Sequence, residues 1–329
     1  MRKLASIQKI SKLEPIEGAN SIVKATVLGW QLVVKKGEFN EGDLCVYCEI
    51  DSILPERPEF EFLKPRKMRI RTIKLRGQIS QGICFPLSIL PEGTEIEEGK
   101  DVTEILGITK YEPPIPANLE GVAKGRFPSF IPKTDEPRVQ IMQDVLDKYK
   151  GETFFYTEKL DGSSATFYYN DGEFGVCSRN LELLETEENT QWKLARKYKV
   201  EEKFKGLNKN MAIQGEVIGE NVQSNKYNLR GQDIYFFNAY DIDEHRFLNL
   251  DEFEEFFKKM ELKTVPLLEK NYKLSNNIEE LVELATGKSV LNNIQREGIV
   301  LRPVKEIVDN TGRISFKAIN PKFLLKYDD

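Results

Sequence analysis

One lysine lies between two acids in residues 157–164, whose sequence is Thr-Glu-Lys-Leu-Asp-Gly-Ser-Ser. The amine of Lys159 can act as a nucleophile once it has lost its proton. Its neighbours Glu158 and Asp161 favour the unreactive ammonium, because negative charge stabilises positive charge. A surface strand with a Lys–Asp pair explains these eight residues equally well. The rest of the chain must decide between the two interpretations.

The residues on either side of Lys159 predict two β-strands joined by a turn. Residues 154–157 and 165–169 are runs of β-forming residues. Alternation along the first strand places Thr157, Lys159 and Asp161 on one face. Asp161-Gly162 is typical of a turn, because glycine tolerates a positive φ. We therefore expect Lys159 near the end of a strand.

Three predicted strand ends each carry a carboxylate beside a glycine. They are Asp161-Gly162, Gly215-Glu216 and Glu297-Gly298. Taken singly, each acid is more often a turn residue than a metal ligand. Taken with Lys159 they form a coherent site, since hard oxygen ligands suit Mg²⁺ or Mn²⁺, which proteins often share with phosphates.

Composition limits what kind of protein this is. The 329 residues are enough for two domains, and the net charge of -5 restricts any polyanion site to a local basic patch. The sequence shows neither a bilayer-spanning apolar run nor a leader, which predicts a cytoplasmic protein, or a nuclear one in a eukaryote, with no membrane partner. Cys45 and Cys48 have the C-x-x-C spacing, but Cys84, Cys177 and the single histidine do not supply the second ligand pair of a zinc site, so free buried thiols are predicted.

Residues 1–112 predict a small β-barrel of the OB type. Short strand-like runs at 22–28, 31–34, 44–50 and 82–87 alternate with glycine turns. Residues 64–76 hold lysines and arginines but no acid, and Arg69 and Arg71 are expected on one face of a strand. Guanidinium groups match phosphate oxygens well, whereas a cation-rich strand edge that discourages pairing is the alternative. The candidates for phosphate or nucleic-acid contact are Arg66, Arg69, Arg71 and Arg76.

Residues 113–137 are a Pro-rich connector, and residues 138–329 predict an α+β domain with largely antiparallel sheets. Helical spacing is found at 139–146, 186–205, 251–261 and 277–286. Strand-like runs are found at 211–219, 234–242, 297–303 and 315–322. Strands and helices mix without a βαβ rhythm, which disfavours a parallel sheet.

The lysine segment and five later motifs resemble the motifs of covalent nucleotidyltransferases, the superfamily of ATP-dependent DNA and RNA ligases and mRNA capping enzymes. The later motifs are Ser178-Arg179-Asn180, Gly215-Glu216, the aromatic run that ends at Asp241, residues 297–302 and Ser315-Phe316-Lys317. The Lys-Leu-Asp-Gly-Ser-Ser form is more similar to RNA ligases than to the other members. An OB-type module placed before the lysine resembles the fifth RNA ligase family.

This resemblance implies a three-step reaction assisted by two Mg²⁺ or Mn²⁺ ions. Lys159 would attack the α-phosphate of ATP, AMP would pass to an RNA 5′-phosphate, and an RNA 3′-hydroxyl would displace it. Asp161, Glu216 and Glu297 would hold a metal directly or through its waters, and Lys317 would neutralise the α-phosphate. Phe237 would stack on adenine, with a core position as the alternative. The other implied nucleotide contacts are Glu158, Arg179, Glu216, Glu297, Arg138 and Lys322.

The sequence departs from the family at Ser315, where related RNA ligases often carry a first lysine; Lys322 or Lys326 is a candidate substitute. Three alternatives stay open. A DNA ligase shares every step, a capping enzyme is expected to carry its OB module after the last motif, and a non-catalytic RNA-binding protein would use the basic barrel. RNA with 3′-hydroxyl and 5′-phosphate ends is the expected partner, and a monomer is the expected state.

Overall fold

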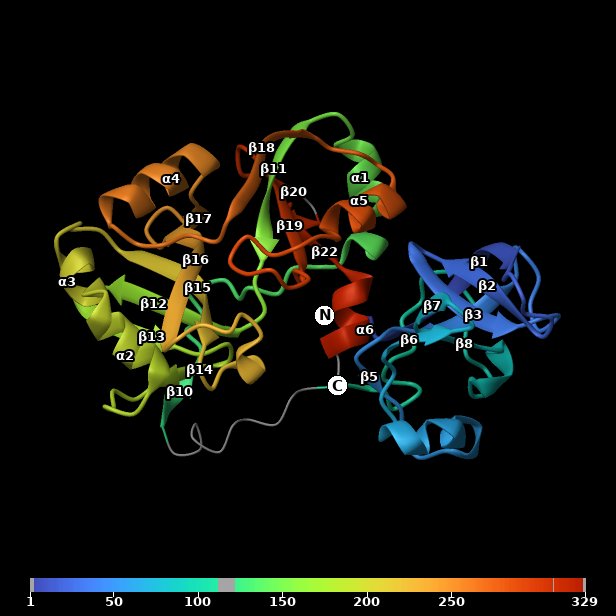
Figure 1. The fold of residues 1–329 in the computed structure, drawn as a ribbon. Helices are drawn as coiled ribbons and strands as arrows, with labels where there is room; N and C mark the ends of the chain where they lie inside the picture. Colours follow the sequence, from blue (N-terminus) through green and yellow to red (C-terminus); the bar gives the residue numbers. More distant parts are fainter. Residues whose placement is uncertain (1–2, 112–121, 310, 328–329) are drawn as a thin grey trace. The chain divides into compact units, whose positions relative to one another are not determined.

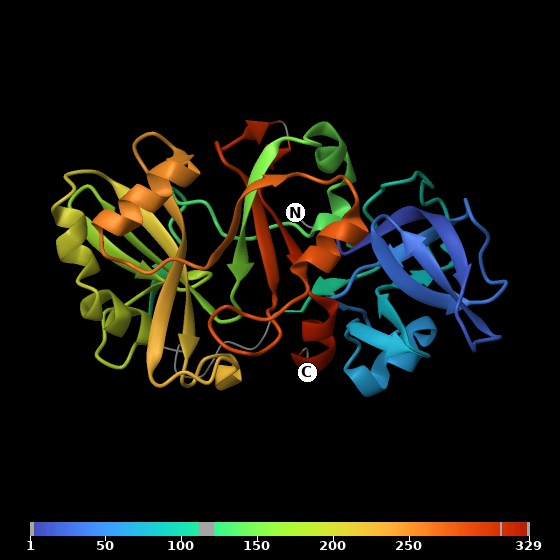
Figure 2. The ribbon, with the colours of Figure 1, turned by 45° about the horizontal axis from the view of Figure 1, so that its top comes forward.

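The computed structural model describes residues 3–111, 122–309 and 311–327, which fall into two compact units. The first unit holds residues 3–111, 139–143 and 321–327, and the second holds residues 122–138, 144–309 and 311–320. The chain can be followed by colour in Figures 1 and 2. Residues 113–121 of the predicted connector lie outside the described residues.

The first unit is built on a five-stranded antiparallel sheet in the order β3-β2-β1-β4-β8. Its strands are β1 (Ala5–Pro15), β2 (Ile22–Val27), β3 (Trp30–Lys35), β4 (Leu44–Cys48) and β8 (Ile83–Phe85). An irregularity between Ile10 and Lys12 divides the long β1, which pairs with β2 on one side and β4 on the other. The sheet encloses a core that includes Trp30 and Tyr47, and this arrangement confirms the predicted OB-type barrel.

Shorter elements complete the first unit. They are β5 (Ser52–Ile53) with β9 (Thr109–Lys110), β6 (Thr72–Leu75) with β7 (Gln78–Gln81), and η1 (Pro58–Arg66), η2 (Leu87–Ile89), η4 (Val139–Ile141) and α6 (Pro321–Tyr327). Helix α6 packs against β6, although its residues follow the last motif in the sequence. The predicted strand at 315–322 is therefore too long, because Pro321 begins this helix.

The strand predicted to carry Arg69 and Arg71 begins only at Thr72. The first residues of the basic stretch belong to the 3₁₀ helix η1, and Lys67 and Met68 adopt positive φ before β6 begins at Thr72. Arg69 is buried, donates to Asp51 at 3.0 Å and lies over the ring of Tyr111. The four cysteines are free and buried, as predicted.

The second unit contains a seven-stranded and a four-stranded sheet, and every pairing between their described strands is antiparallel. The larger sheet, in spatial order, consists of β10 (Ala123–Arg126), β14 (Leu181–Leu183), β13 (Glu173–Cys177), β12 (Ser163–Asn170), β15 (Met211–Gly219), β16 (Gln232–Asp241) and β17 (Arg246–Phe247). The smaller sheet consists of β18 (Leu267–Lys273), β11 (Thr153–Lys159), β19 (Gly298–Pro303) and β22 (Phe316–Ile319). This confirms the predicted α+β class with antiparallel sheets.

Helices cover these sheets through amphipathic faces. The remaining elements are α1 (Gln143–Lys148), α2 (Thr190–Lys197), α3 (Val200–Lys205), α4 (Leu250–Lys259), α5 (Ile278–Ala285), η5 (Gln223–Asn225) and the pair β20 (Val308–Asp309) and β21 (Gly312–Arg313). Trp192 of α2, Phe204 of α3 and Phe257 of α4 share one core with the larger sheet. These three helices lie beside that sheet in the ribbon (Figure 1). The helix predicted over 186–205 is two helices, because Lys199 adopts a left-handed φ of 52° between them.

The turn after Lys159 joins the two sheets. Strand β11 belongs to the smaller sheet and β12 to the larger one, so Asp161-Gly162 crosses between sheets and is not a hairpin turn. Gly162 does not have a positive φ, which corrects the reason given for this glycine. A Cβ atom there would lie 2.1 Å from the carbonyl oxygen of Val217, so close packing of two chain segments requires glycine.

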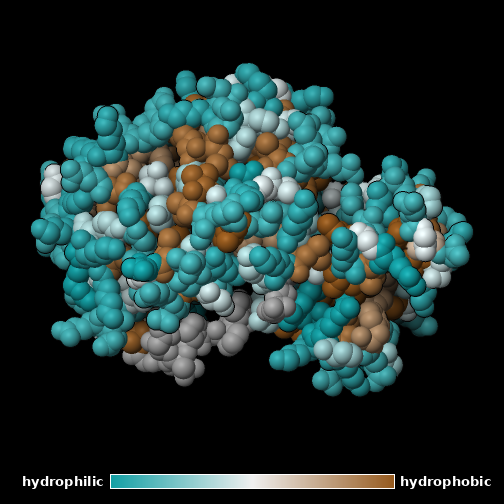
Figure 3. Space-filling model, in the orientation of Figure 1, coloured by the Kyte–Doolittle hydropathy of each residue, from teal (hydrophilic) through white to brown (hydrophobic). Residues whose placement is uncertain are grey.

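Hydrophilic residues cover most of the face seen in the space-filling view (Figure 3). None of the helices in the described part of the chain is long and apolar enough to cross a membrane.

Candidate active site

Strands β11 and β19 bring Lys159 and Glu297 together. Lys159 ends β11 and pairs in register with Gly298, the first residue of β19, so Glu297 comes directly before its partner. The ammonium nitrogen of Lys159 lies 2.7 Å from both carboxylate oxygens of Glu297. Both side chains are partly buried, which strengthens an ion pair.

Glu216 reaches the same site from the larger sheet. Its strand, β15, pairs with β12 so that Glu216 faces Ser164, just after the crossing turn. The backbone N–H of Gly162 donates to Oε1 of Glu216 at 3.0 Å. The close packing at Gly162 therefore fixes a carboxylate beside the turn that carries Asp161.

These charges shift one another's pKa values. Burial opposes the charged form of Lys159, but the carboxylates of Glu297, Glu216 and Asp161 outweigh it and raise the pKa of Lys159. Burial, reinforced by the other carboxylates, raises the pKa of Glu216 to about 8 despite the opposing charge of Lys159. Burial also raises the pKa of Glu297. The amine of Lys159 is thus held as an ammonium, as the sequence predicts, but Glu297 supplies the close contact.

Lys317 lies on the same face of the smaller sheet as Lys159. Thr157 pairs with Val300, and Val300 pairs with Lys317, so these three residues form a row two residues along β11 from Lys159. Two residues along one strand, such as Thr157 and Lys159, are roughly 7 Å apart. Burial and the nearby charges of Lys159 and Arg138 lower the pKa of Lys317 to about 7. The backbone of Lys317 forms an isolated bridge with Arg138, which brings two predicted site residues together.

Asp161 has a partner that the sequence motifs do not indicate. Its carboxylate forms an ion pair with Lys226, which comes from the segment between β15 and β16. The N–H of Asp161 also donates to the hydroxyl of Tyr227 at 2.8 Å. The 65 residues that separate Lys226 from Asp161 explain why no local pattern reveals the pair.

Phe237 of β16 lines a pocket that it shares with residues of β11. The walls of the pocket include Phe155, Thr157, Phe237 and Arg302, and Lys159 is not among its lining residues. Thr157 and Lys159 lie on the same face of β11, so one wall of the pocket is two residues along this strand from the lysine. Phe237 is only partly buried, which leaves its ring available to a planar ligand in the pocket.

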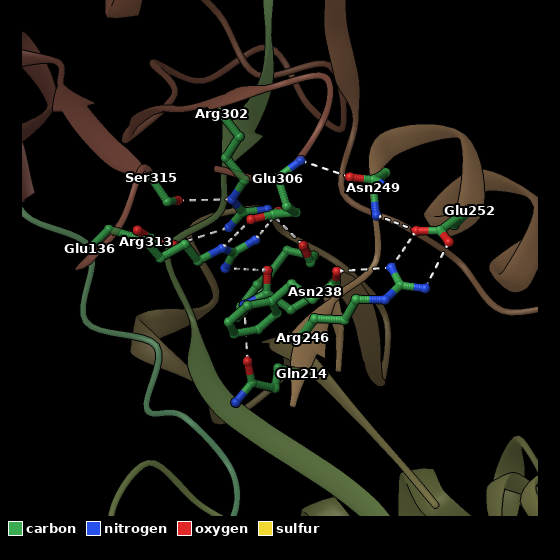
Figure 4. Close-up of polar contacts among 12 residues, drawn as sticks. Glu136, Gln214, Asn238, Arg246, Asn249, Glu252, Arg302, Glu306, Arg313 and Ser315 are labelled. Carbon is green, nitrogen blue, oxygen red and sulfur yellow. Dashed lines mark hydrogen bonds and ion pairs between the residues drawn. The ribbon is translucent and has the colours of Figure 1, made fainter. Parts of the chain in front are cut away.

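A buried arginine connects three segments beside this pocket (Figure 4). Arg302 donates to the hydroxyl of Ser315 at 2.9 Å, to the carbonyl of Phe237 at 2.7 Å and to Glu136 at 3.1 Å. Its side chain is 4% exposed. Ser315, where related ligases often carry a lysine, is therefore buried against a guanidinium group. Because Ser315 is 2% exposed, a lysine at this position would put a second cation in a buried environment.

The other predicted residues lie around this cluster or apart from it. Glu158 faces the opposite side of β11 from Lys159 and accepts from the N–H of Val290 at 2.8 Å. Arg179 is exposed and paired with Asp135 at 3.0 Å. Lys322 and Lys326 lie on α6 and belong to the first unit. Of the four arginines of the basic stretch, Arg66 and Arg76 are exposed, Arg71 is partly buried and Arg69 is buried.

The acidic cluster suits a hydrated cation better than a bare one. Asp161, Glu216 and Glu297 all act on Lys159 electrostatically. Within residues 3–111, 122–309 and 311–327, however, no three carboxylate, thiol or imidazole groups lie close enough to ligate one ion directly. Mg²⁺ and Mn²⁺ commonly keep several waters, so the oxygen-rich cluster fits such an ion bound partly through water.

The comparisons with known proteins give a consistent result. A family model described as RNA ligase matches residues 152–319, and a model described as OB-fold domain matches residues 4–87. No curated protein sequence matches the chain.

Solved structures of Naegleria gruberi RNA ligase resemble the whole chain. The complex with PPi is 43% identical, with a TM-score of 0.92 and complete coverage of both chains. A lysine-to-methionine mutant with AMP and Mn is 43% identical, with a TM-score of 0.93 and complete coverage of both chains. A lysine-to-alanine mutant with ATP and Mn is 43% identical, with a TM-score of 0.92 and 99% coverage of both chains.

The fold and these matches define a ligase of the covalent nucleotidyltransferase type with an N-terminal OB-fold domain. The chain belongs to the RNA ligase family. This confirms the resemblance inferred from the motifs and the class of enzyme that it implies.

Proposed function

We propose that this chain is an ATP-dependent RNA ligase that joins 3′-hydroxyl and 5′-phosphate RNA ends through an AMP bound covalently to Lys159. The observation that carries the proposal is the contact of Lys159 with Glu297 inside a cluster of three carboxylates. The similar Naegleria ligase has been solved with ATP and Mn, with AMP and Mn, and with PPi, which supports ATP and Mn²⁺ or Mg²⁺ for this chain.

The first step uses the lone pair of the Lys159 amine. The neutral amine attacks the α-phosphorus of ATP, a P–N bond forms, the bond to the β-phosphate oxygen breaks, and pyrophosphate leaves. Lys317 lies on the same face of the sheet and stabilises the negative charge that develops on the α-phosphate. The AMP group then moves to the RNA 5′-phosphate, and the 3′-hydroxyl oxygen finally displaces AMP.

Asp161, Glu216 and Glu297 are the residues that would hold a divalent cation. The cation would supply positive charge that disfavours the ammonium form of Lys159 and compensates phosphate charge. In its absence Lys159 keeps its proton, because the carboxylates favour the ammonium. The proposed reaction also involves a second divalent cation.

The nucleotide contacts divide between the pocket and the edge of the cluster. Phe237 stacks on adenine in the pocket, where a planar ring adds roughly 1 kcal/mol beyond apolar burial. Arg138, next to Lys317, contacts the departing phosphates. Arg179 contacts the ribose or a phosphate after it leaves Asp135, and Glu158 and Lys322 are the remaining proposed nucleotide contacts.

We propose RNA contacts for the exposed arginines of the first unit. Arg66 and Arg76 present their guanidinium groups to solvent, so they can bind phosphate without first breaking a buried ion pair. Arg69 is held by Asp51 and Tyr111, and its contribution to RNA binding would therefore be indirect. We expect the ligase to act as a monomer.

Transfer of label from α-labelled ATP tests the proposal. The protein is incubated with α-labelled ATP or GTP and Mn²⁺, resolved on a denaturing gel, and then exposed to 5′-phosphorylated RNA. We expect an adduct from ATP that passes to RNA, and no adduct from Lys159→Ala protein that remains folded by circular dichroism. An adduct from GTP alone would indicate a capping enzyme. The absence of any adduct would indicate a non-catalytic RNA-binding protein.

A further inference from the structure

Lys226 neutralises a carboxylate that the proposed reaction needs for a cation. Its ammonium is ion-paired with Asp161, and both side chains are partly buried, with exposed fractions of 14% and 20%. Lys226 lies outside every motif that suggests the reaction, and no step of that reaction requires it. A lysine in this position therefore needs a different explanation.

The segment that carries Lys226 is fixed against the site. Tyr227, the next residue, is 1% exposed in a small apolar cluster with Leu160, and its hydroxyl accepts from the N–H of Asp161. The carbonyl of Tyr227 accepts from the side-chain amide of Asn292 at 2.6 Å. These contacts hold the backbone of Lys226 beside Asp161, so the ion pair is not a chance meeting of two surface side chains.

The backbone just before Lys226 adopts an uncommon conformation. The preceding residues Gln223, Ser224 and Asn225 have positive φ values of 44°, 59° and 46°. Non-glycine residues adopt this conformation at some cost, more so for glutamine and serine than for asparagine. The side chain of Asn225 accepts from the N–H of Leu229 and stabilises the bend.

Two of the three carboxylates of the cluster are thus paired with lysines, Glu297 with Lys159 and Asp161 with Lys226. A divalent cation held by these acids would add two positive charges next to two ammonium groups. Electrostatic repulsion then favours release of one or both lysines. Lys159 leaves Glu297 when it becomes the nucleophile. The ammonium group of Lys226 is then the remaining positive charge that must move away from the cation.

We propose that Lys226 is a positioning residue that occupies Asp161 until a divalent cation replaces it, so that cation binding and displacement of the Lys226 side chain are one event. The inference rests on the proposed function, because it assumes that Asp161 helps to hold the cation. Lys226 lowers the affinity of the free enzyme for the cation and keeps Asp161 oriented while the cation is absent.

Direct binding of Mn²⁺ tests this. Isothermal titration calorimetry with MnCl₂ alone compares the wild-type chain, Lys226→Met and Lys226→Arg. We expect Lys226→Met to bind Mn²⁺ about tenfold more tightly, which corresponds to ~1.4 kcal/mol. Lys226→Arg retains the pairing and should stay within about twofold of wild type. The matched control is Lys263→Met, which breaks another Lys–Asp pair, with Asp233, in the same unit.

A second background separates competition at Asp161 from a general change in charge. In Asp161→Asn protein, substitution of Lys226 by Met should no longer change the affinity for Mn²⁺. Equal or weaker Mn²⁺ binding by Lys226→Met, including no binding by either protein, overturns the inference. A gain that persists in the Asp161→Asn background, or that Lys263→Met reproduces, also overturns it. Adduct formation with α-labelled ATP by the same wild-type sample judges the proposed function separately.

Discussion

The ammonium of Lys159 lies 2.7 Å from each carboxylate oxygen of Glu297, although 138 residues separate them in the sequence. The pairing keeps the lysine in place and at the same time in its unreactive form, since the carboxylates raise its pKa. A group that attacks phosphorus must give up this contact. The proposed divalent cation would release the lysine, because it would bind the same carboxylate.

Replacement of Glu297 by glutamine should therefore reduce catalysis. Glu297→Gln retains the shape of the side chain but removes a charge from the proposed cation site. We expect the rate of adduct formation from ATP to fall about 10–100-fold, the usual cost of a lost metal-site interaction. Single-turnover gel assays with Mn²⁺ measure it. Glu201→Gln, which breaks a surface pair with Lys205, is the matched control and should retain the wild-type rate; an equal rate in Glu297→Gln would contradict the assignment.

Lys317 should take up a proton when the enzyme binds ATP above neutral pH. Burial and neighbouring cations lower its pKa to about 7, so at pH 8 the side chain is mostly neutral in the free protein. Bound phosphate raises this pKa because it favours the ammonium. Binding at pH 8 therefore consumes a proton, whereas at pH 6 the lysine is already charged and uptake is small.

Calorimetry with α,β-methylene ATP, in buffers of different ionisation enthalpy, measures the protons exchanged. Proton uptake at pH 8 should exceed that at pH 6 and should be lost in Lys317→Met. The same uptake in the variant and in wild type would show that another group titrates and that Lys317 does not face the phosphates.

Arg66 and Arg76 should affect RNA binding and leave the reaction with ATP unchanged. Both are exposed in the first unit. If each neutralises one phosphate of single-stranded RNA, the double variant Arg66→Ala/Arg76→Ala reduces the slope of log affinity against log salt by ~1.4. Fluorescence anisotropy over a range of salt measures this. Lys258→Ala/Lys259→Ala on α4 changes the net charge equally, and an identical loss of slope there would point to a non-specific charge effect.

Sequence patterns correctly predicted those parts of the site that depend on residues a few positions apart. The strand over 211–219 matches β15, and Lys159 stands at the end of β11 as alternation and its flanking residues indicated. The acids of the three motifs do act together on Lys159. These features follow from residue types a few positions apart, which is the range over which sequence periodicity carries information.

Features that depend on distant contacts were not predictable. Gly162 is required because Val217 packs against it, and Lys226 contacts Asp161 across 65 residues of sequence. The assignment of α6 to the first unit depends on its packing against β6. In each case the decisive partner lies many residues away, and the local sequence carries no sign of it.

Ser315 should not tolerate the lysine that related ligases often carry. Its side chain is 2% exposed and accepts a hydrogen bond from Arg302, whose guanidinium group is itself buried. Ser315→Lys would place a second buried cation against Arg302, and the neighbouring carboxylate of Glu136 is already paired with Arg302. We expect a loss of about 2–4 kcal/mol in the free energy of unfolding and no increase in the rate of adduct formation.

Urea unfolding followed by circular dichroism measures the loss. Ser315→Ala removes only the hydroxyl group, so it should cost about 1 kcal/mol and preserve most of the activity. If Ser315→Lys were as stable as wild type and formed the adduct faster, the buried arrangement around Arg302 would have to rearrange readily. Ser315 would then be a missing phosphate contact and not a consequence of how Arg302 joins β19 to Phe237 of β16.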